Sequence, residues 1–312
     1  MIKFSVVIPT YNRADLLIET VKSILSQSYP VSEIIIIDDG SMDDTGIRVK
    51  ALNNPLIKYT KQANTGQNIA RHNGVLAAEN DWVALCDSDD LWLDDHIERL
   101  VTLIQSFPDS DFVFSNFTEF GNSSRYSDKF ASAPQSWDIS NGASNEQHFR
   151  QYDASLFYQL LNFTPVFPSA LAFRKSKYIE YRAISENLKG QNLGAEDFYT
   201  TLIFAAKGKV ASDSQITTKI RKHDENHSGS NVKNMEGEVL IIEEVVRQLE
   251  KDGVQTINKN VVTKAIDWRL KALAYHYFAN RDKENFDRVY RLLSGTPKLF
   301  LKKAILYLSH FI

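Results

Sequence analysis

Short, apolar runs recur in the first third of the chain. Phe4 to Pro9 (FSVVIP), Glu33 to Asp38 (EIIIID) and Trp82 to Asp87 (WVALCD) are apolar through their centres, with no alternation of polar and apolar positions. Leu56 to Tyr59 is a shorter segment that also reads as a strand. Strands buried on both faces of a parallel sheet have this pattern. The sequence therefore predicts four buried strands before residue 90.

Segments with helical spacing separate these strands. Within Ala14 to Gln27, leucine, isoleucine and valine recur three to four positions apart, and Pro30 follows. Further helices are predicted over Thr45 to Leu52 and Gln67 to Ala78. Strands that alternate with helices form a parallel sheet with right-handed connections and helices on both faces. Ligands of such sheets bind beyond the carboxyl ends of the strands.

The chain changes in character after residue 90. An amphipathic helix is predicted over Asp94 to Phe107 and a strand over Asp111 to Phe117. Residues 121–150 are rich in Ser, Asn, Gly and Asp without a clear period, which predicts a functional loop or a poorly ordered insertion. Further strands are predicted at Ala170 to Arg174 and Gln215 to Ile220, with a helix at Glu196 to Ala206 between them. We expect these later strands to add antiparallel pairs to the sheet.

From about Met235 onward the pattern is helical only. The predicted helices cover Val239 to Leu249, Val262 to Asn280 and Phe286 to Leu293. The polar stretch HDENHSGSN precedes them, and we place a domain boundary there, near Ser230. The expected fold class is therefore α/β, with a mostly parallel, Rossmann-like sheet in residues 1–230 and an all-helical region in residues 231–312.

Composition and charge narrow the classes of function. The chain has 312 residues, of which 43% are hydrophobic, and its formal net charge is -3. This balance gives no reason to expect nucleic acid as a partner. The single cysteine, Cys86, lies in an apolar run and fits a buried side chain in a reducing compartment. We find no signal-peptide pattern and no apolar run of membrane-spanning length, so we expect a cytoplasmic protein.

An acidic turn directly follows the strand at Trp82 to Asp87. Asp87, Ser88, Asp89 and Asp90 present alternating carboxylates, which can converge on one hard cation with a diphosphate completing the coordination shell. Mg²⁺ or Mn²⁺ would suit such a site. The alternative is that these acids only cap the following helix.

Two further polar segments follow strand ends. Asp38, Asp39, Gly40 and Ser41 could accept hydrogen bonds from a base or ribose, although Asp-Gly is also a common solvated turn. In the segment Pro9 to Arg13 (PTYNR), Tyr11 could stack on a planar base. The sequence has neither a GxGxxG fingerprint after the first strand nor a P-loop. Phosphate would therefore be held by a metal ion and basic side chains.

Five motifs in order resemble glycosyltransferase family 2, whose fold is of the GT-A type. They are VVIPTYNR (6–13), IIIDDGSMDD (35–44), NTGQNIARHNG (64–74), WVALCDSDD (82–90) and GAED (194–197). The resemblance covers about the first two thirds of the chain. It implies a catalytic domain over residues 1–230, with a nucleotide-sugar half to about residue 117 and an acceptor half after it.

The resemblance also implies roles for individual residues. It implies nucleotide-sugar binding, with uracil the commonest base, by residues Pro9, Thr10, Tyr11, Arg13, Asp39, Asn64, Gly66, Arg71, Asp87 and Ser88. It implies a divalent metal, Mn²⁺ or Mg²⁺, bound by Asp89 and Asp87. His223 resembles the late histidine that approaches the metal or diphosphate, but His227 lies close enough in sequence to take that place.

The last motif supplies the implied general base, Asp197. A carboxylate in the first turn of a helix is favoured by the helix dipole and stays ionised. The implied reaction is a single inverting displacement, in which Asp197 deprotonates the acceptor hydroxyl as it attacks the anomeric carbon. The metal and Arg71 would stabilise the charge that develops on the departing nucleoside diphosphate.

Our expectations about the acceptor and about the location of the protein are less specific than those about single residues. By analogy with the family we expect a saccharide or lipid-linked saccharide acceptor, in the synthesis of bacterial surface polysaccharide or glycolipid. In residues 296–312, Lys298, Lys302 and Lys303 lie near one side of a predicted amphipathic helix. Packing on the catalytic domain is favoured, and peripheral contact with the inner face of the membrane is the alternative. A homo-oligomer through the helical region stays open.

Two other functions remain as alternatives. A sugar-1-phosphate nucleotidyltransferase also uses a metal and an α/β sheet, but the chain lacks a glycine-rich, lysine-bearing phosphate loop after its first strand. The chain could also bind nucleotide sugars without catalysis, or carry a helical interaction module on a vestigial domain. The presence of Asp87, Asp89 and Asp197 favours the enzyme.

Overall fold

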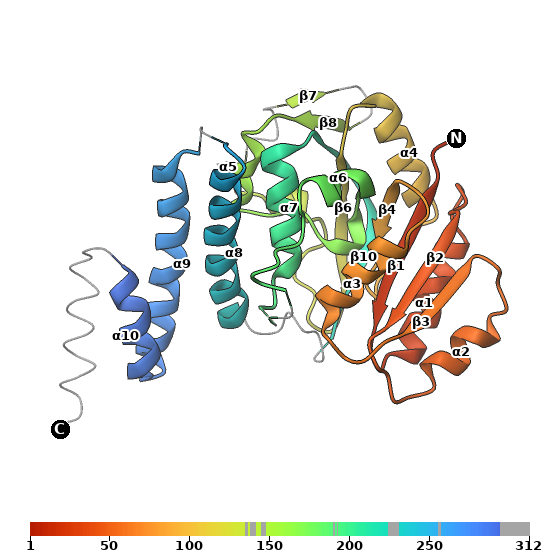
Figure 1. Ribbon diagram of the computed structural model, residues 1–312, viewed down its shortest axis with the longest axis horizontal. Coiled ribbons are helices and arrows are strands. Elements are labelled where there is room, and N and C mark those ends of the chain that lie inside the picture. The colour runs from red at the N-terminus through yellow and green to blue at the C-terminus, as the bar shows by residue number, and fades with distance from the viewer. Residues whose placement is uncertain are drawn as a thin grey trace. The chain divides into compact units, whose positions relative to one another are not determined.

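The computed structural model describes residues 1–134, 137, 142–144, 148–189, 191, 193–223, 231–254 and 257–293. The chain forms two compact units, of which the first comprises residues 1–192 and 199–226 and the second residues 193–198 and 227–312. The first unit is α/β and the second is helical (Figure 1). The expected fold class is thereby confirmed. Ser230, where the sequence places a domain boundary, lies outside the described residues, and that boundary stays a prediction.

One mixed sheet organises the first unit. Within the described residues the strand order is β3-β2-β1-β4-β9-β6-β10-β8-β7, and β5 pairs with β10. The strands are β1 Phe4–Thr10, β2 Glu33–Asp38, β3 Ile57–Lys61, β4 Trp82–Leu85, β5 Leu91–Trp92, β6 Phe112–Gly121, β7 Gly142–Ser144, β8 Phe149–Tyr152, β9 Leu171–Arg174 and β10 Val210–Lys222. The helices that lie wholly or partly in this unit are α1 Ala14–Leu25, α2 Thr45–Ala51, α3 Gln67–Ala77, α4 His96–Ser106, α5 Leu156–Leu160, α6 Lys175–Glu180 and α7 Glu196–Lys207, with short 3₁₀ helices at Phe130–Ser132 and Pro168–Ala170.

Residues 1 to about 117 match the predicted alternation of strands and helices. β1 pairs in parallel with both β2 and β4, and β2 pairs in parallel with β3. Every residue of β1 and β2 is buried, as the continuous apolar runs predict. Phe4, Val6 and Ile8 belong to the same apolar cluster as buried side chains of α1, α2 and α4. These three helices therefore cover one face of the sheet.

The opposite face of β1 is covered by α3, which approaches unusually closely at Gly74. A Cβ atom on Gly74 would lie 2.4 Å from Val7 Cγ1 and 3.3 Å from Ile37 Cγ1. Only glycine allows the helix to come this near to the sheet. This close packing fixes α3, whose amino-terminal part carries Arg71.

The rest of the first unit, after about residue 117, departs from the prediction in two places. Residues 121–150 are expected as a loop or a poorly ordered insertion, but their described part contains a 3₁₀ helix, β7 and the start of β8. β10 begins at Val210 rather than near Gln215, and it pairs in parallel with β6 along its length. The expected antiparallel pairs are present at β9 with β4 and β6, and at β8 with β10. The sequence analysis did not predict the strand that carries the buried Phe149 and Tyr152, because polar residues surround them in the sequence.

The second unit contains α8 Asn231–Lys251, α9 Lys259–Ala279 and α10 Lys283–Leu292, which are close to the three helices that the sequence predicts. Leu273, Tyr277 and Phe286 belong to the apolar cluster of this unit. Asn258 and Asp282 cap α9 and α10 through their side chains. In the described part of the chain no helix has the length and apolar composition that crossing a membrane requires.

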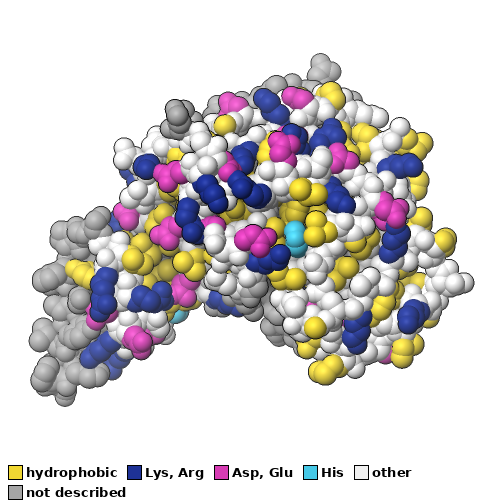
Figure 2. Space-filling model, in the orientation of Figure 1, with side chains coloured by type: hydrophobic (Ala, Val, Ile, Leu, Met, Phe, Trp, Pro, Cys, Tyr) yellow, Lys and Arg dark blue, Asp and Glu magenta, His cyan; other side chains and the backbone are white. Residues whose placement is uncertain are grey.

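Acidic and basic side chains are interspersed over the face of the molecule in Figure 2, as the formal net charge of -3 predicts. Any functional site must therefore depend on local arrangements of charge.

Candidate active site

The strands that precede the candidate residues end at one edge of the sheet. β6 and β10 run in the same direction as β4, because β9 is antiparallel to both β4 and β6. Thr10 and Asp38 are the last residues of β1 and β2, Asp87 lies just after β4, and His223 directly follows β10. The fold thus brings residues from four distant parts of the chain to the carboxyl edge, where α/β sheets bind ligands.

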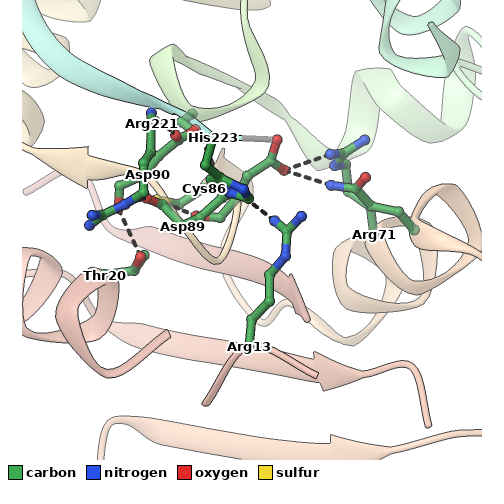
Figure 3. A network of polar contacts seen from close by, with 11 residues as sticks. Arg13, Thr20, Arg71, Cys86, Asp89, Asp90, Arg221 and His223 are labelled. Atoms are coloured by element: carbon green, nitrogen blue, oxygen red, sulfur yellow. Dashed lines mark hydrogen bonds and ion pairs between the residues drawn. The ribbon is translucent and has the colours of Figure 1, made fainter. Parts of the chain in front are cut away.

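Asp89 is the centre of this edge. Its Oδ2 lies 2.6 Å from Arg13 Nη1 and 3.0 Å from His223 Nε2 (Figure 3). When the Asp89 carboxylate accepts this hydrogen bond, the donor is the His223 tautomer with its hydrogen on Nε2. The Asp89 side chain is only 8% exposed. The structure thus brings His223 to the acidic turn, while His227 lies outside the described residues.

Asp87 takes part in a separate contact with α3. Its Oδ1 accepts hydrogen bonds from Arg71 Nη2 at 2.7 Å and from Gln67 Nε2 at 3.0 Å. The backbone N–H of Asp87 donates to Ser169 Oγ at 2.9 Å. The close packing of α3 on β1 therefore delivers a cation to the acidic turn. Arg71 stands where it could neutralise a phosphate next to Asp87.

Asp90 is a buried anchor of the same turn. Its carboxylate accepts from Ser169 Oγ at 2.5 Å and from the backbone N–H of Arg221 at 2.8 Å. Its backbone carbonyl accepts from Thr20 Oγ1 at 2.8 Å. Burial, followed by the charges of Asp89 and Asp87, raises the pKa of Asp90 well above its ordinary value. Asp90 therefore fixes the shape of the turn and leaves binding to its neighbours.

Arg221 is a residue that sequence reasoning missed. Its Nε donates to the carbonyl oxygen of Asp89 at 2.8 Å, and its Nη2 lies 2.6 Å from Glu19 Oε2. Its guanidinium also lies 4.7 Å from the centre of the Phe120 ring. Arg221 thereby ties the acidic turn to α1 and to the end of β10. Arg221 could have been predicted from strand alternation, because that alternation places the side chains of residues 221 and 223 on the same side of an extended chain.

Asp39 binds a neighbouring loop. Its Oδ1 accepts from the backbone N–H of Thr65 at 2.9 Å and from Gln62 Nε2 at 2.8 Å, while its Oδ2 accepts from the backbone N–H of Gly66 at 2.8 Å. This side chain is buried. Asp39 therefore holds the turn that leads into α3, a role the sequence does not indicate. Its predicted contact with base or ribose remains a prediction.

Two glycines allow the loops to meet. Gly40 has a φ of 90°, and a Cβ there would lie 3.1 Å from the backbone nitrogen of Asn64. Gly66 has a φ of 95° at the start of α3. Positive φ values of this size suit glycine and strain other residues. Asn64 and Gly66, two of the residues assigned to the donor site, are exposed on this loop.

The end of β1 offers polar and aromatic surface. Among buried polar side-chain atoms in the described residues, Thr10 Oγ1 is one that has no hydrogen-bond partner. Buried polar atoms are normally paired, so such a hydroxyl is suited to a ligand. Tyr11, which follows, is 38% exposed, whereas Pro9 lies inside the sheet opposite Ile37. Ser88, within the acidic turn, is buried.

Asp197 is the second residue of α7 and is half-buried. It falls in the second compact unit, whereas Asp39, Asp87 and Asp89 belong to the first. Its place in the first turn of a helix agrees with the sequence analysis. Its role as the base stays a prediction.

A divalent metal fits part of this arrangement. Asp89 Oδ2 and His223 Nε2 converge to 3.0 Å, and carboxylate and imidazole are suitable ligands for a first-row metal ion. His223 would offer Nε2 to a cation as the tautomer that carries its hydrogen on Nδ1. Among the described residues no three His, Cys, Asp or Glu side chains form a metal-binding group. A two-residue set needs ligand oxygens, such as those of a diphosphate, to complete the shell.

Relatives of known sequence match about two fifths of the chain. Glycosyltransferase GlyG of Streptococcus pneumoniae is 34% identical over 122 residues, which cover 38% of this chain and 40% of GlyG. The putative teichuronic acid biosynthesis glycosyltransferase TuaG of Bacillus subtilis is 32% identical over 135 residues, 42% of this chain and 53% of TuaG. The chain thus spans about half or less of these relatives.

Solved structures resemble the whole chain in fold. TarS residues 1–349 of S. aureus, in complex with UDP-GlcNAc, has a TM-score of 0.60 and 19% identity, covering 93% of this chain and 92% of that one. Mannosyltransferase PcManGT from Pyrobaculum calidifontis, in complex with GDP-Man and Mn²⁺, has a TM-score of 0.58 and 16% identity, covering 99% and 81%. At these identities the likeness establishes the fold alone.

The family itself follows from the sequence. The pattern described as Glycosyl transferase family 2 matches residues 5–181, more than half of the chain. The matched region includes β1, β2, β4 and the acidic turn at Asp87 to Asp90. The chain belongs to glycosyl transferase family 2.

Proposed function

We propose that this chain transfers a sugar, with inversion at the anomeric carbon, from a nucleoside-diphosphate donor to an acceptor hydroxyl. The proposal rests on one observation above the others. Asp89 Oδ2 contacts both Arg13 and His223, next to the ion pair of Asp87 with Arg71, at the carboxyl edge of the sheet. This edge combines the ligands that a metal–diphosphate group needs with two basic side chains.

The residues divide the binding of the donor between them. The nucleoside would lie at the end of β1, where Thr10 has an unpaired buried hydroxyl and Tyr11 an exposed ring. The diphosphate would lie over the acidic turn, within reach of Arg71. Asp89 and His223 would hold Mn²⁺ or Mg²⁺, which supplies Lewis-acid stabilisation of the leaving diphosphate when bound. We favour a UDP-sugar as donor, since the TarS structure contains UDP-GlcNAc.

The transfer step assigns the remaining groups. Asp197 takes the proton from the acceptor hydroxyl as its oxygen forms a bond to the anomeric carbon. The bond from that carbon to the diphosphate oxygen breaks, and Arg71 neutralises the negative charge that develops on this oxygen. The similarity to TuaG, a putative teichuronic acid biosynthesis glycosyltransferase, supports a role in the synthesis of a surface polysaccharide. In its more specific form, the proposal takes a lipid-linked saccharide as the acceptor. The transferred sugar is then a hexosyl or N-acetylhexosaminyl group.

The test is release of nucleoside diphosphate from a panel of UDP- and GDP-sugars, with Mn²⁺, Mg²⁺ or EDTA. We expect slow, metal-dependent release from one class of donor even without acceptor, since water can replace the hydroxyl. Release of pyrophosphate from a sugar-1-phosphate and a nucleoside triphosphate would instead indicate the nucleotidyltransferase. Donor binding without any turnover would indicate the non-catalytic alternative. Asp109→Asn, an exposed acid at the other edge, is the matched control for Asp89→Asn.

The remaining expectations about the surroundings of the enzyme stay predictions. The segment 296–312, expected to pack on the catalytic domain or to contact a membrane, lies outside the described residues. A cytoplasmic location and assembly into a homo-oligomer are likewise open to test, by fractionation and by light scattering.

A further inference from the structure

A lysine lies between aromatic rings in the acceptor half. Lys129 Nζ lies 4.2 Å from the ring centre of Tyr126 and 4.6 Å from that of Phe163. Trp137 packs edge-on against Phe163 with the ring centres 5.4 Å apart. Within the described part of the chain, no carboxylate forms an ion pair with Lys129. The only partners its ammonium has there are aromatic ring faces.

The backbone holds this lysine in a fixed place. The backbone N–H of Lys129 donates to the carbonyl of Phe117, in β6, at 3.1 Å. Asn116, also in β6, donates to Asp128 Oδ1 at 2.8 Å and accepts from the backbone N–H of Phe130 at 3.1 Å. The residues on both sides of Lys129 are therefore bound to the sheet. These contacts fix the backbone at Lys129, so its side chain starts from a defined position, unlike that of a mobile surface lysine.

A second lysine lies nearby and is already neutralised. Lys222 Nζ lies 3.4 Å from Glu119 Oε1 and 5.3 Å from the ring centre of Phe167. Lys222 directly precedes His223, which contacts Asp89. The group formed by Lys129, Lys222 and the aromatic rings beside them therefore adjoins the acidic turn. Burial lowers the pKa of Lys129, and Lys222 acts in the same direction, whereas Glu119 raises it. A partly desolvated ammonium with unused N–H donors is best satisfied by an anion.

The place of this lysine in the sheet separates it from the donor. Most of the proposed donor contacts come from β1, β2, β4 and α3, and the metal ligand His223 follows β10, whereas Lys129 is anchored on β6, on the other side of β9 from β4. The apolar ring faces beside it suit the C–H face of a sugar ring. We propose that Lys129 binds an anionic group of the acceptor, a phosphate or a carboxylate, so that the acceptor is an acidic saccharide. This inference rests on the proposed function and adds the substrate class.

The first experiment compares acceptor probes with the unmodified, full-length chain. The probes are a methyl hexoside, its 6-phosphate and the corresponding uronoside, assayed by transfer from the donor identified above. We expect kcat/KM for at least one anionic probe to exceed that for the neutral probe by roughly 10–100-fold, the range that a charge-assisted hydrogen bond supplies. The phosphate and uronate arms distinguish the two sources of charge. Equal values for all three probes would overturn the inference.

The second experiment assigns the preference to Lys129. Lys129→Met keeps an unbranched side chain in the aromatic slot and removes the charge, so we expect the anionic preference to fall roughly tenfold or more through KM. Lys129→Arg should retain most of it, because the charge remains. Lys207→Met is the matched control, since Lys207 also lies over a ring, 5.5 Å from that of Tyr181, but directly before β10 at the opposite edge.

The readouts also separate this inference from the function on which it rests. Metal-dependent hydrolysis of the donor without acceptor, and donor affinity, should be unchanged in Lys129→Met. Weaker donor affinity in that variant would instead place Lys129 at the donor diphosphate and overturn the inference alone. Failure of the unmodified chain to release nucleoside diphosphate from any donor would overturn the proposed function and this inference together.

Discussion

Arg13 Nη1 lies 2.6 Å from Asp89 Oδ2, so a fixed positive charge stands against the carboxylate that would bind a metal ion. Both side chains are largely buried, at 17% and 8% exposed, so solvent screens this pair weakly. A divalent ion that approaches Asp89 must therefore compete with the guanidinium of Arg13.

Removal of Arg13 should accordingly strengthen metal binding in the absence of donor. We expect Arg13→Ala to lower the dissociation constant for Mn²⁺ about tenfold, because a competing cation worth about 1.4 kcal/mol is lost. Titration calorimetry or the Mn²⁺ paramagnetic resonance signal measures this. Arg48→Ala, which breaks an exposed pair with Asp15, should leave the constant unchanged. Weaker binding in Arg13→Ala would show that Arg13 supports the site instead of competing for it.

Asp89→Asn should abolish metal-dependent turnover. The amide keeps the shape of the side chain but loses the charge that attracts the ion, and we expect at least a ~100-fold fall in donor turnover at fixed Mn²⁺. The measurement is nucleoside diphosphate release as a function of Mn²⁺ concentration. Asp109→Asn controls for the loss of one acid. Turnover of Asp89→Asn that saturates at the same Mn²⁺ concentration as the unmodified chain would remove Asp89 from the metal site.

Asp197→Asn tests the proposed base separately. We expect kcat for transfer to fall by about 100–10,000-fold, the range for loss of a general base, while donor affinity stays within a factor of two. Single-turnover transfer and equilibrium binding of UDP give the two quantities. Normal transfer by this variant would assign the proton to another group.

Gly74→Ala tests the close approach of α3 to β1. The new methyl group would lie 2.4 Å from Val7 Cγ1, so the helix must shift, and we expect a loss of about 1–3 kcal/mol in the free energy of unfolding. Urea denaturation gives this value. Val7→Ala removes the opposing methyl groups, and the double variant should recover part of the loss. A Gly74→Ala chain as stable as the unmodified one would mean that α3 tolerates displacement.

His96 should make stability depend on pH. Burial lowers its pKa to about 3, against about 6.5 in the unfolded chain. Between these values the unfolded chain binds a proton that the folded chain does not, so the contribution of His96 is lost as pH falls from 6.5 towards 3. In His96→Phe the free energy of unfolding should fall less steeply, by up to about 1.4 kcal/mol per pH unit.

The measurement for His96 is urea denaturation at pH 6.5, 5.5 and 4.5. His96 Nδ1 contacts Thr217 Oγ1 at 2.7 Å, so His96→Phe will also change stability at all pH values, and only the slope is diagnostic. The exposed His276 supplies the control variant His276→Phe, which should keep the original slope. Equal slopes in all three chains would show that the buried ring is not the source of the pH dependence.

The sheet was predictable wherever burial on both faces left a continuous apolar run. β1, β2 and β4 follow from FSVVIP, EIIIID and WVALC because no polar residue interrupts them. β8 has the sequence FRQY inside a polar segment, and its place is set by pairing with β10, some sixty residues later. Pairing with a strand so far along the chain leaves no pattern in the local sequence. The early start of β10 has the same cause, since β6 extends along its whole length.

The candidate site was predictable where motifs carry the chemistry and not where distant contacts do. Asp87, Asp89 and Arg71 lie in motifs and His223 was assigned by resemblance to the family, and the structure brings all four to one edge. Ser169 and Arg221 hold the same turn from 79 and 132 positions away along the chain, with no motif of their own. Asp39 has several donors from one loop, which no local spacing indicates.

The position of β10 has a consequence for biosynthesis. It is the last strand of the sheet to leave the ribosome, yet it lies between β6 and β8. A nascent chain that ends before residue 210 therefore has an open seam between β6 and β8, and it lacks both Arg221 and His223. Exposed strand edges are prone to mispairing, so this chain should be most vulnerable to it until the translation of β10 is complete.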